Sequence, residues 1–599
     1  MSVTKIPPRN EAKKEDTWNL TSLYPNDGAW EKAFETFKAG IPTLSLHKGK
    51  LAENLSTFRD CLNTYFSHEE LGERLGYYSF LRYNEDASNS DHQARQGRFM
   101  QAAVQAESEI SFLRSEVQSI PDAIMQSYME DPSIEPFKVY LKKLLRYKPH
   151  ILSPQEERVI AMAGEANQTA QKTFGALTDV DMDFGVIQTP EEEKTLSQSS
   201  YGSLIQHKDR KVREQTFVQF HNHFESHKNT LASLYAGSIQ LDVYQAKVRN
   251  YSSSVEAALF PDNVPVEVYR NLVNTVRENL PTLHSYYKLR SEKLGVKPLE
   301  LWDTKVSLVG SVEVNTPYDQ AVSTIIEALQ PLGDEYCSIL KKGLTSGWVD
   351  KYENKGKRSG AFSAGSFHGD PYILMNYKDD VLRDVFTLAH EAGHSMHSWY
   401  STKHNPFPHY QYTIFEAEVA STFNEQLLFE YMMAKAESKE LKAYLLNKQI
   451  DDMLATLYRQ TMFAEFELKV HEMSEHGQPL TVDAFRDEYR SLMEAYFGPD
   501  VAIHESADME GLRIPHFYRA FYVYKYATGI SAAVSLSQRV LQGGTKERDE
   551  YFSFLKSGGS TFPIDSLKKA GVDMSKKEPI VKALKQFEQY VSQLGQLLD

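Results

Sequence analysis

The residues of this chain that could do chemistry are concentrated at positions 390–394, where the sequence HEAGH forms an H-E-x-x-H pattern. Residues four apart on a helix share one face with Cβ atoms about 5–6 Å apart, so His390 and His394 would converge on one metal ion. Glu391 would project about 100° around the helix, where it could take a proton from a metal-activated water. The pattern therefore predicts a hydrolytic zinc centre with Glu391 as general base.

A catalytic zinc site needs a third protein ligand and an open position. The metzincin arrangement is excluded, because His397 stands where that class has glycine and Tyr400 stands where it has a third histidine. We interpret His397 as a neighbour of the metal and not as a ligand. A carboxylate from the next helical stretch, residues 412–430, is the natural alternative.

That stretch contains Glu416, Glu418, Glu425 and Glu430. Glu418 and Glu425 are seven residues apart and share a helix face, whereas Glu416 points elsewhere. We predict that Glu418 is the third ligand. Glu425, two turns further on, is placed to accept a hydrogen bond from the free nitrogen of a ligating histidine and so fix its tautomer.

Two other hypotheses compete with an internal peptide-bond hydrolase. A zinc exopeptidase that removes C-terminal residues would use the same metal helix, and cleavage of a peptide blocked at both ends distinguishes it. A non-enzymatic helical scaffold would carry the pattern by chance, with its histidines merely hydrogen-bonded. The metal content of the purified protein distinguishes that case.

The elements that must position these residues can also be predicted. Residues 379–402 carry apolar side chains at helical spacing, with Asp379 or Asp380 as the N-cap, and the segment ends before Pro406. Elsewhere, Leu51, Leu55, Phe58 and Leu62 recur at steps of four and three. That spacing predicts an amphipathic helix and is typical of the chain, whose first 200 residues we expect to be mostly helical.

Strand signals are few. Residues 179–189 alternate between apolar and polar, which predicts a half-buried strand or a surface hairpin. Residues 360–369 are glycine-rich, but they lack the lysine of a phosphate loop, so we expect a flexible loop followed by a strand at 371–377. We expect an exposed edge of that strand to pair with the backbone of an extended peptide.

Composition limits the remaining classes of function. The net charge of −15 over 599 residues disfavours nucleic-acid binding, which needs a concentrated basic face. Cys61 and Cys337 alone cannot form a disulfide framework, which favours a reducing compartment. The N-terminus lacks a secretory apolar segment and no apolar run reaches membrane-spanning length. We therefore expect a cytoplasmic protein without nucleic-acid or membrane partners; nothing in the sequence specifies an oligomeric state.

Several segments resemble a known family. HEAGH followed by FEAEVASTFNE is similar to the M3 peptidases, specifically the oligoendopeptidase F branch of the thimet oligopeptidase group. TWNLTSLYPNDGAWEKAF, GKRSGAFSAG and HFYRAFYVYKYATG are similar to the same branch, so the resemblance covers nearly the whole chain.

The resemblance implies a mostly α, two-lobed helical metallopeptidase fold that encloses a deep substrate channel, with a small β-sheet near the zinc helix. It implies one Zn²⁺ per chain, supports Glu418 as third ligand, and gives short unfolded peptides as substrates in intracellular peptide turnover. We expect an N-terminal helical region at 1–200 and a catalytic region at 201–599.

The resemblance also implies further site residues. In the family, a histidine and tyrosines downstream of the zinc helices assist catalysis, and here these are His516 and Tyr522, with Tyr526 behind them. Tyr518 in the same segment, and Gly365 in the loop GKRSGAFSAG, are further candidates for substrate contacts.

Overall fold

The computed structural model describes residues 6–310, 312 and 315–599. The chain divides into two compact units, each made from three separate segments. Unit 1 comprises Met1–Pro149, Glu313–Met432 and Leu536–Val572, and unit 2 comprises His150–Val312, Met433–Ser535 and Asp573–Asp599. The boundaries of these units differ from the boundary expected at residue 200. The N-terminal helical region at 1–200 and the catalytic region at 201–599 stay predictions about functional regions.

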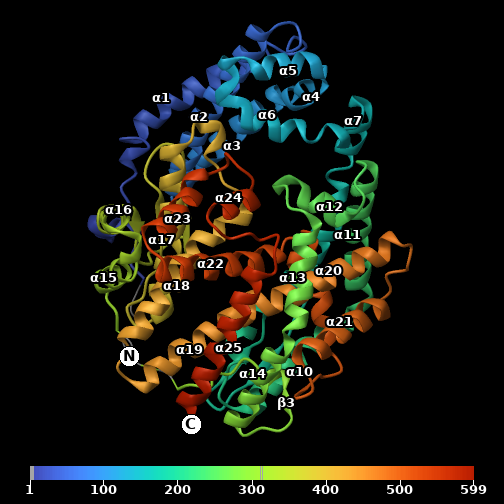
Figure 1. Cartoon of the computed structure of the whole chain (residues 1–599), viewed down its shortest axis with the longest axis vertical. Coiled ribbons are helices and arrows are strands. Elements are labelled where there is room, and N and C mark those ends of the chain that lie inside the picture. Colours follow the sequence, from blue (N-terminus) through green and yellow to red (C-terminus); the bar gives the residue numbers. More distant parts are fainter. Residues whose placement is uncertain (1–5, 311, 313–314) are drawn as a thin grey trace. The chain divides into compact units, whose positions relative to one another are not determined.

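Helices dominate both units, as the sequence predicted (Figure 1). Unit 1 contains α1 (Asp27–Gly40), α2 (Leu55–Glu85), α3 (Ser90–Ile110), α4 (Phe112–Ser119), α5 (Asp122–Glu130), α6 (Lys138–Leu145), α15 (Tyr318–Ala328), α16 (Asp334–Thr345), α17 (Leu382–His404), nearly all of α18 (Ile414–Lys435), α23 (Thr545–Ser557) and α24 (Pro563–Lys569).

Unit 2 is built in the same way. Its helices are α7 (Pro154–Met162), α8 (Thr169–Gly175), α9 (Gln198–Leu204), α10 (Arg210–Ser226), α11 (Lys228–Val248), α12 (Ser254–Leu259), α13 (Val266–Glu278), α14 (Leu280–Leu294), α19 (Lys439–Met453), α20 (Gln460–Glu475), α21 (Val482–Phe497) and α25 (Glu578–Leu598). Helix α22 (Tyr524–Gln542) begins in unit 2 and ends in unit 1. Among the helices of the described ranges, none combines the length and apolar character needed to cross a bilayer.

The long helix α2 shows how the local sequence determines an element. The side chain of Asn54 accepts a hydrogen bond from the backbone N–H of Thr57 at 2.9 Å and so caps the helix. Phe58 and Leu62 are fully buried, as their spacing predicted, whereas Leu51 is buried in the turn before the helix. This stripe belongs to a hydrophobic core that also contains Trp30 of α1.

A three-stranded sheet lies in unit 1, in the order β4 (Val349–Asp350), β6 (Tyr372–Leu374) and β5 (Phe362–Ala364). Strand β6 pairs in parallel with β4 and antiparallel with β5. The strand predicted at 371–377 is therefore present. The prediction that it has an exposed edge was wrong, because β6 is paired on both sides and β4 and β5 are the strands at the sheet's two edges.

The other strands are short: β1 (Val186–Gln188) pairs with β2 (Glu193–Thr195), and β3 (Leu299–Glu300) pairs with β7 (Val501–Ala502). The hairpin confirms part of the expectation for 179–189. A strand beginning at residue 179 was wrong, because Ala176–Asp181 forms a helical turn that leaves Val180 exposed. Gly185, at φ 72°, adopts a left-handed conformation just before β1.

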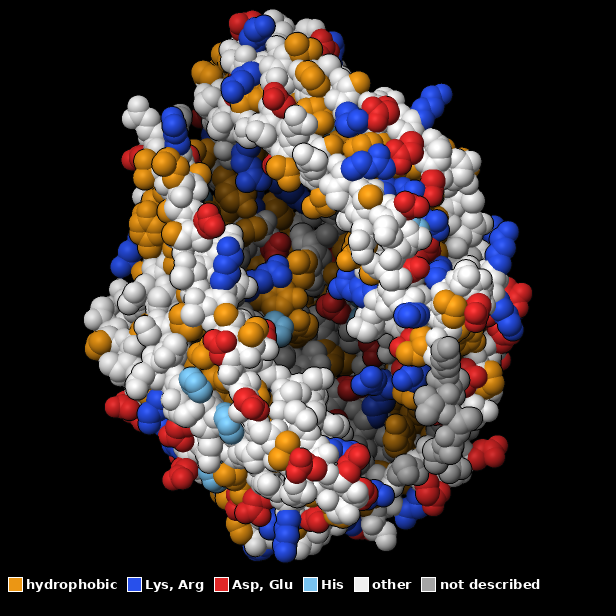
Figure 2. Space-filling model, turned by 180° about the vertical axis from the view of Figure 1, so that it is seen from behind, with side chains coloured by type: hydrophobic (Ala, Val, Ile, Leu, Met, Phe, Trp, Pro, Cys, Tyr) orange, Lys and Arg blue, Asp and Glu red, His pale blue; other side chains and the backbone are white. Residues whose placement is uncertain are grey.

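Charged side chains are spread over the surface. Figure 2 shows acidic and basic groups intermixed over the face in view, so that the described residues of this face present no wide field of one sign.

Candidate metal centre

Helix α17 carries the H-E-x-x-H residues and begins slightly later than the sequence predicted. Its N-cap is Val381, and no side chain caps it, so the prediction of Asp379 or Asp380 was wrong. The aspartate that does bond here is Asp384 in the first turn, whose Oδ2 accepts from the Lys378 backbone N–H at 2.9 Å. The helix ends at His404, before Pro406, as expected.

Helices α17 and α18 pack against each other through a glycine. A Cβ atom on Gly393 would lie 2.5 Å from Ser421 Cα and 2.6 Å from the Ala420 carbonyl oxygen, distances that real Cβ contacts do not reach. Asn424 Nδ2 also donates to the Ala389 carbonyl oxygen across the helix pair at 3.3 Å. The glycine between the two histidines therefore lets the second helix bring a carboxylate close to them.

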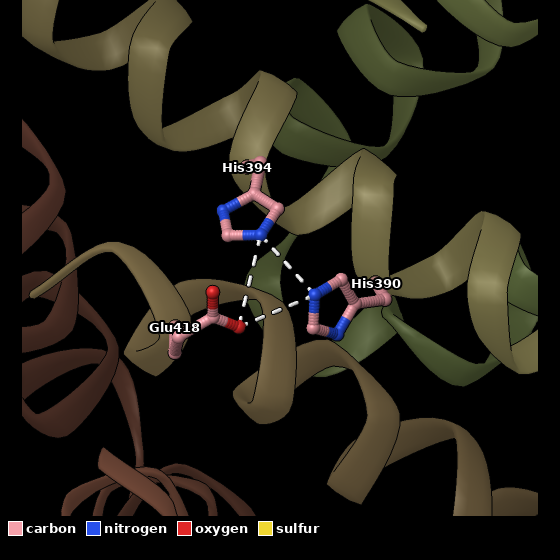
Figure 3. A group of neighbouring side chains, drawn as sticks. All are labelled: His390, His394 and Glu418. Carbon is pink, nitrogen blue, oxygen red and sulfur yellow. Dashed lines mark hydrogen bonds and ion pairs between the residues drawn. The ribbon is translucent and has the colours of Figure 1, made fainter. Parts of the chain in front are cut away.

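The three predicted ligands lie together (Figure 3). His390 Nε2 lies 3.2 Å from His394 Nε2 and 3.4 Å from Glu418 Oε2, and His394 Nε2 lies 3.9 Å from that oxygen. Tetrahedral zinc with ligands at 2.0–2.2 Å requires ligand atoms about 3.3 Å apart. The donor atoms, their spacing and their chemistry fit one divalent metal ion.

Two further glutamates of α18 have different positions. Glu425 Oε1 lies 2.5 Å from His390 Nδ1, the ring nitrogen that faces away from the other ligands. Glu416 is fully buried and instead accepts weak bonds from Thr413 at 3.4 Å. Burial raises the pKa of Glu416 to about 7.

His397 lies next to the cluster without joining it. Its ring is fully buried and stacks on Tyr412 with centroids 3.7 Å apart. Neither ring nitrogen has a hydrogen-bond partner within the described part of the chain. Burial, and then repulsion from His394, lower the pKa of His397 to about 3, so the ring is neutral.

The electrostatics of the cluster favour a cation. Burial alone would lower the pKa of His390, but hydrogen bonds to Glu418 and Glu425 and their charges raise it to about 10. Burial raises the pKa of Glu391 to about 7, and repulsion from Glu418 adds to this, while the charge of His390 and a Ser363 backbone hydrogen bond oppose it. The carboxylates thus demand a compensating positive charge, which a metal ion supplies.

A cavity of about 540 Å³ in unit 1 opens onto the cluster. Besides the ligands and Glu391, it is lined by β5 residues and by Tyr77, Tyr410 and Tyr412. We assigned no functional role to these tyrosines from the sequence. Tyr410 and Tyr412 follow a 3₁₀ turn, Phe407–His409, in a short connection between two helices, where no periodic pattern identifies them.

Gly365, a predicted substrate contact, lines the same cavity. A Cβ atom there would lie 2.4 Å from the side chain of Ser398 on α17. The glycine thus allows the segment after β5 to approach the metal helix. Ser363 on β5 makes the neighbouring contact, with its Oγ 2.8 Å from Ser395 Oγ.

The downstream candidates lie in unit 2 and three of them form a cluster. The rings of His516 and Tyr522 are nearly parallel with centroids 6.1 Å apart, and Tyr526 OH donates to Tyr522 OH at 3.3 Å. Tyr518 instead packs against Phe174, 4.6 Å between centroids, and its hydroxyl is buried.

Residues 203–586 match the family model described as Peptidase family M3, and residues 116–184 match one described as Oligopeptidase F. The chain is 40% identical to an oligoendopeptidase F homolog of Borreliella burgdorferi, covering 97% of this chain and 98% of that protein. It is also 40% identical to the oligopeptidase PepF of Bacillus subtilis, covering 99% and 89%. A solved structure from Chlamydophila abortus is similar with a TM-score of 0.94 and 36% identity, covering 99% and 100%.

Proposed function

The chain belongs to peptidase family M3, and from this premise we propose that it is a zinc-dependent oligoendopeptidase that hydrolyses internal bonds of short unfolded peptides. The family makes it a metalloendopeptidase. The metal's identity, the roles of individual residues and the part in cytoplasmic peptide turnover are our proposals. The convergence of His390, His394 and Glu418 near tetrahedral spacing is the observation that carries the metal assignment.

We propose specific roles for the residues around the cluster. His390, His394 and Glu418 hold the ion, and bound Zn²⁺ supplies Lewis-acid chemistry that lowers the pKa of water and polarises a carbonyl. Glu391 takes the proton of the attacking water and delivers it to the leaving amine. Glu425 holds His390 in the tautomer whose Nε2 faces the metal.

Strand β5 is the element that we propose binds the substrate. This edge strand lines the cavity that opens onto the cluster, and Ser363 lies beside Glu391. An extended peptide adding to the open edge of β5 would be held through its backbone, independently of its sequence. Substrates with N-methylated amides test this, because each lost donor should raise KM with little change in kcat; an unchanged KM at every position contradicts it.

The catalytic assignment of His516 and Tyr522 rests on the family resemblance. We propose that they donate hydrogen bonds to the developing negative charge on the scissile carbonyl oxygen. Tyr522→Phe removes one hydroxyl and should lower kcat by about 10²-fold or more, with KM little changed. Tyr458→Phe, whose hydroxyl is fully buried and has no partner in the described chain, is the matched control.

The deciding experiment is cleavage of an internally quenched peptide blocked at both ends, by wild type and Glu391→Gln, with zinc content measured for each. We expect the wild type to cleave the peptide but not casein, and the variant to retain zinc without turnover. Glu437→Gln, an exposed position beyond α18, is the control. Cleavage only of peptides with a free C-terminus would favour the exopeptidase, and full activity of Glu391→Gln would overturn the proposed base.

A further inference from the structure

Unit 2 contains a second cavity, of about 440 Å³, lined entirely by its own residues. Its volume lies in the range of small-molecule sites. Most of the wall is apolar and aromatic, and it includes Phe217, Phe463, Phe497, Leu454 and Met493. None of these residues belongs to the metal centre.

The charges on this wall do not balance. Lys305, Arg459 and Arg513 line the cavity, and Glu510 is the one carboxylate among its lining residues in the described chain. Arg290 and Asp451, which are both bonded to the Tyr286 hydroxyl, stand outside the lining and offset each other. His221, which also lines the cavity, is neutral because burial lowers its pKa to about 3. A net positive cavity is unexpected in a chain whose net charge is −15.

Glu510 is already bonded to both arginines of the wall. Its Oε2 accepts from Arg459 Nη2 and from the Tyr489 hydroxyl, and its Oε1 accepts from Arg513 Nη2 at 2.9 Å. These bonds hold the pKa of Glu510 well below its usual range, although burial alone would raise it. The carboxylate therefore accepts from one nitrogen of each guanidinium.

Several donors on the same wall consequently lack strong acceptors. The guanidinium of Arg459 lies over the rings of Phe463 and Phe497. Among the described residues, the hydrogen-bond acceptor of its Nη1 is the thioether sulfur of Met462, at 3.4 Å, and a thioether is a weak acceptor. Arg513 Nε is buried without a partner in the described chain. Lys305 is exposed and forms no ion pair or hydrogen bond with any described residue. A buried cationic donor without an acceptor, such as Arg513 Nε, is costly unless a ligand completes it.

We propose that this cavity binds a small organic anion, with its carboxylate or phosphate group on Lys305, Arg459 and Arg513 and its apolar body against the aromatic wall. Arginine and lysine together recognise oxyanions through charge-assisted hydrogen bonds. The net positive charge excludes a metal ion. The apolar wall excludes a strongly hydrated bare ion as the best ligand, because most of its surface would find no polar partner.

Lys305 separates this proposal from a purely structural network. The competing explanation is that the bonds of Glu510 to Arg459 and Arg513 only join the N-terminal end of α20 to the segment 507–513. Lys305 makes no contribution to that network. Lys305 is exposed and lines the same cavity as Arg459, and an anion in the cavity would relieve the repulsion between these two cations.

The test is isothermal titration of the full chain, metal-loaded and chelator-treated, with four probes. These are 3-phenylpropionate, phenyl phosphate, the neutral 3-phenylpropanamide and inorganic phosphate. The variants are Lys305→Gln and Lys305→Glu, which remove no described contact. Lys288→Gln, an exposed lysine of α14 that also lacks a described partner, is the matched control.

We expect 3-phenylpropionate or phenyl phosphate to bind at a single site, with or without metal. The anion that binds more tightly shows whether the cavity prefers a carboxylate or a phosphate group. Lys305→Gln should weaken it about tenfold, Lys305→Glu further, and Lys288→Gln not at all. Equal binding of the amide, or loss of binding on chelation, would overturn the proposal. So would an affinity unaffected by Lys305→Glu, or inorganic phosphate binding as tightly as phenyl phosphate.

Discussion

Glu425 Oε1 accepts a hydrogen bond from His390 Nδ1 at 2.5 Å, across the gap between α18 and α17. The bond fixes which ring nitrogen of His390 carries the proton, and so leaves Nε2 free to bind a metal. On the proposed assignment, helix α18 would therefore act on a bound metal twice, through the proposed ligand Glu418 and, two turns later, through the orientation of His390.

Glu425→Ala should weaken metal affinity by about 10- to 100-fold, because His390 loses its orienting partner and some of its basicity. A chelating dye in competition with the protein measures this directly. Glu437→Ala, exposed and remote from the cluster, should leave affinity at the wild-type value. Equal affinities for Glu425→Ala and wild type would show that the hydrogen bond has no role in metal binding.

Gly393→Ala should destabilise the fold by about 1–3 kcal/mol, since the added methyl group overlaps the backbone of α18 and must push the two helices apart. Metal affinity should fall with it. Gly237→Ala, in the exposed middle of α11 where an added Cβ meets nothing within 4 Å, should instead stabilise by about 0.5–1 kcal/mol. Denaturant unfolding of both variants measures the change in unfolding free energy, which must have opposite signs for the two substitutions.

Metal removal should loosen the helices that supply the ligands. Without an ion, three clustered donors no longer join α17 to α18, so backbone amides of both helices should exchange faster with deuterium. Helices α11 and α13 in unit 2 contain no ligand and provide the internal control. Identical exchange in α17 and α18 before and after chelation would contradict a metal held by these residues.

Glu467 on α20 should make stability depend on pH. The side chain is fully buried, its Oε1 accepts from the Phe521 backbone N–H at 3.0 Å, and burial raises its pKa well above the ordinary value, with repulsion from Asp242 adding to the shift. The folded state thus binds a proton that the unfolded state loses above its normal pKa of 4.5. This contribution to stability is complete below that pH and is lost as pH rises toward the folded pKa.

Glu467→Gln cannot lose that proton, so its unfolding free energy should fall less than that of wild type as the pH is raised from 5 to 8. Glu467→Ala should cost about 2 kcal/mol at pH 5, because it removes the acceptor and leaves a cavity. Parallel pH profiles for wild type and Glu467→Gln would show that Glu467 is ionised in the folded protein.

The metal cluster was predictable because its geometry is local. Helical spacing alone places His390 and His394 on one face and puts Glu418 and Glu425, but not Glu416, on another common face. The structure brings His390, His394 and Glu418 together and places Glu425 on His390. The tyrosines of the cavity were harder to predict, because Tyr77 reaches it from a helix more than 300 residues earlier in the chain.

The errors in the fold have similar physical causes. The apolar residues of β6 predicted its position in the sequence correctly. Whether β6 is an edge strand or a central strand depends on β4, which is only two residues long and leaves no periodic signal. The N-cap of α17 was misplaced because several aspartates compete there, and hydrogen-bond geometry decides among them. The family assignment from short segments was confirmed, and two of those segments carry the three proposed metal ligands.

The discontinuity of the two units has a consequence for biosynthesis. The three proposed metal ligands have been synthesised by residue 418, yet unit 1 is completed only by Leu536–Val572. In that last segment, Phe554 packs on His397 and Tyr551 stacks on Phe423, which covers the backs of α17 and α18. The ribosome must therefore release well over a hundred further residues before the metal helices gain their final cover, so the catalytic centre matures late in translation.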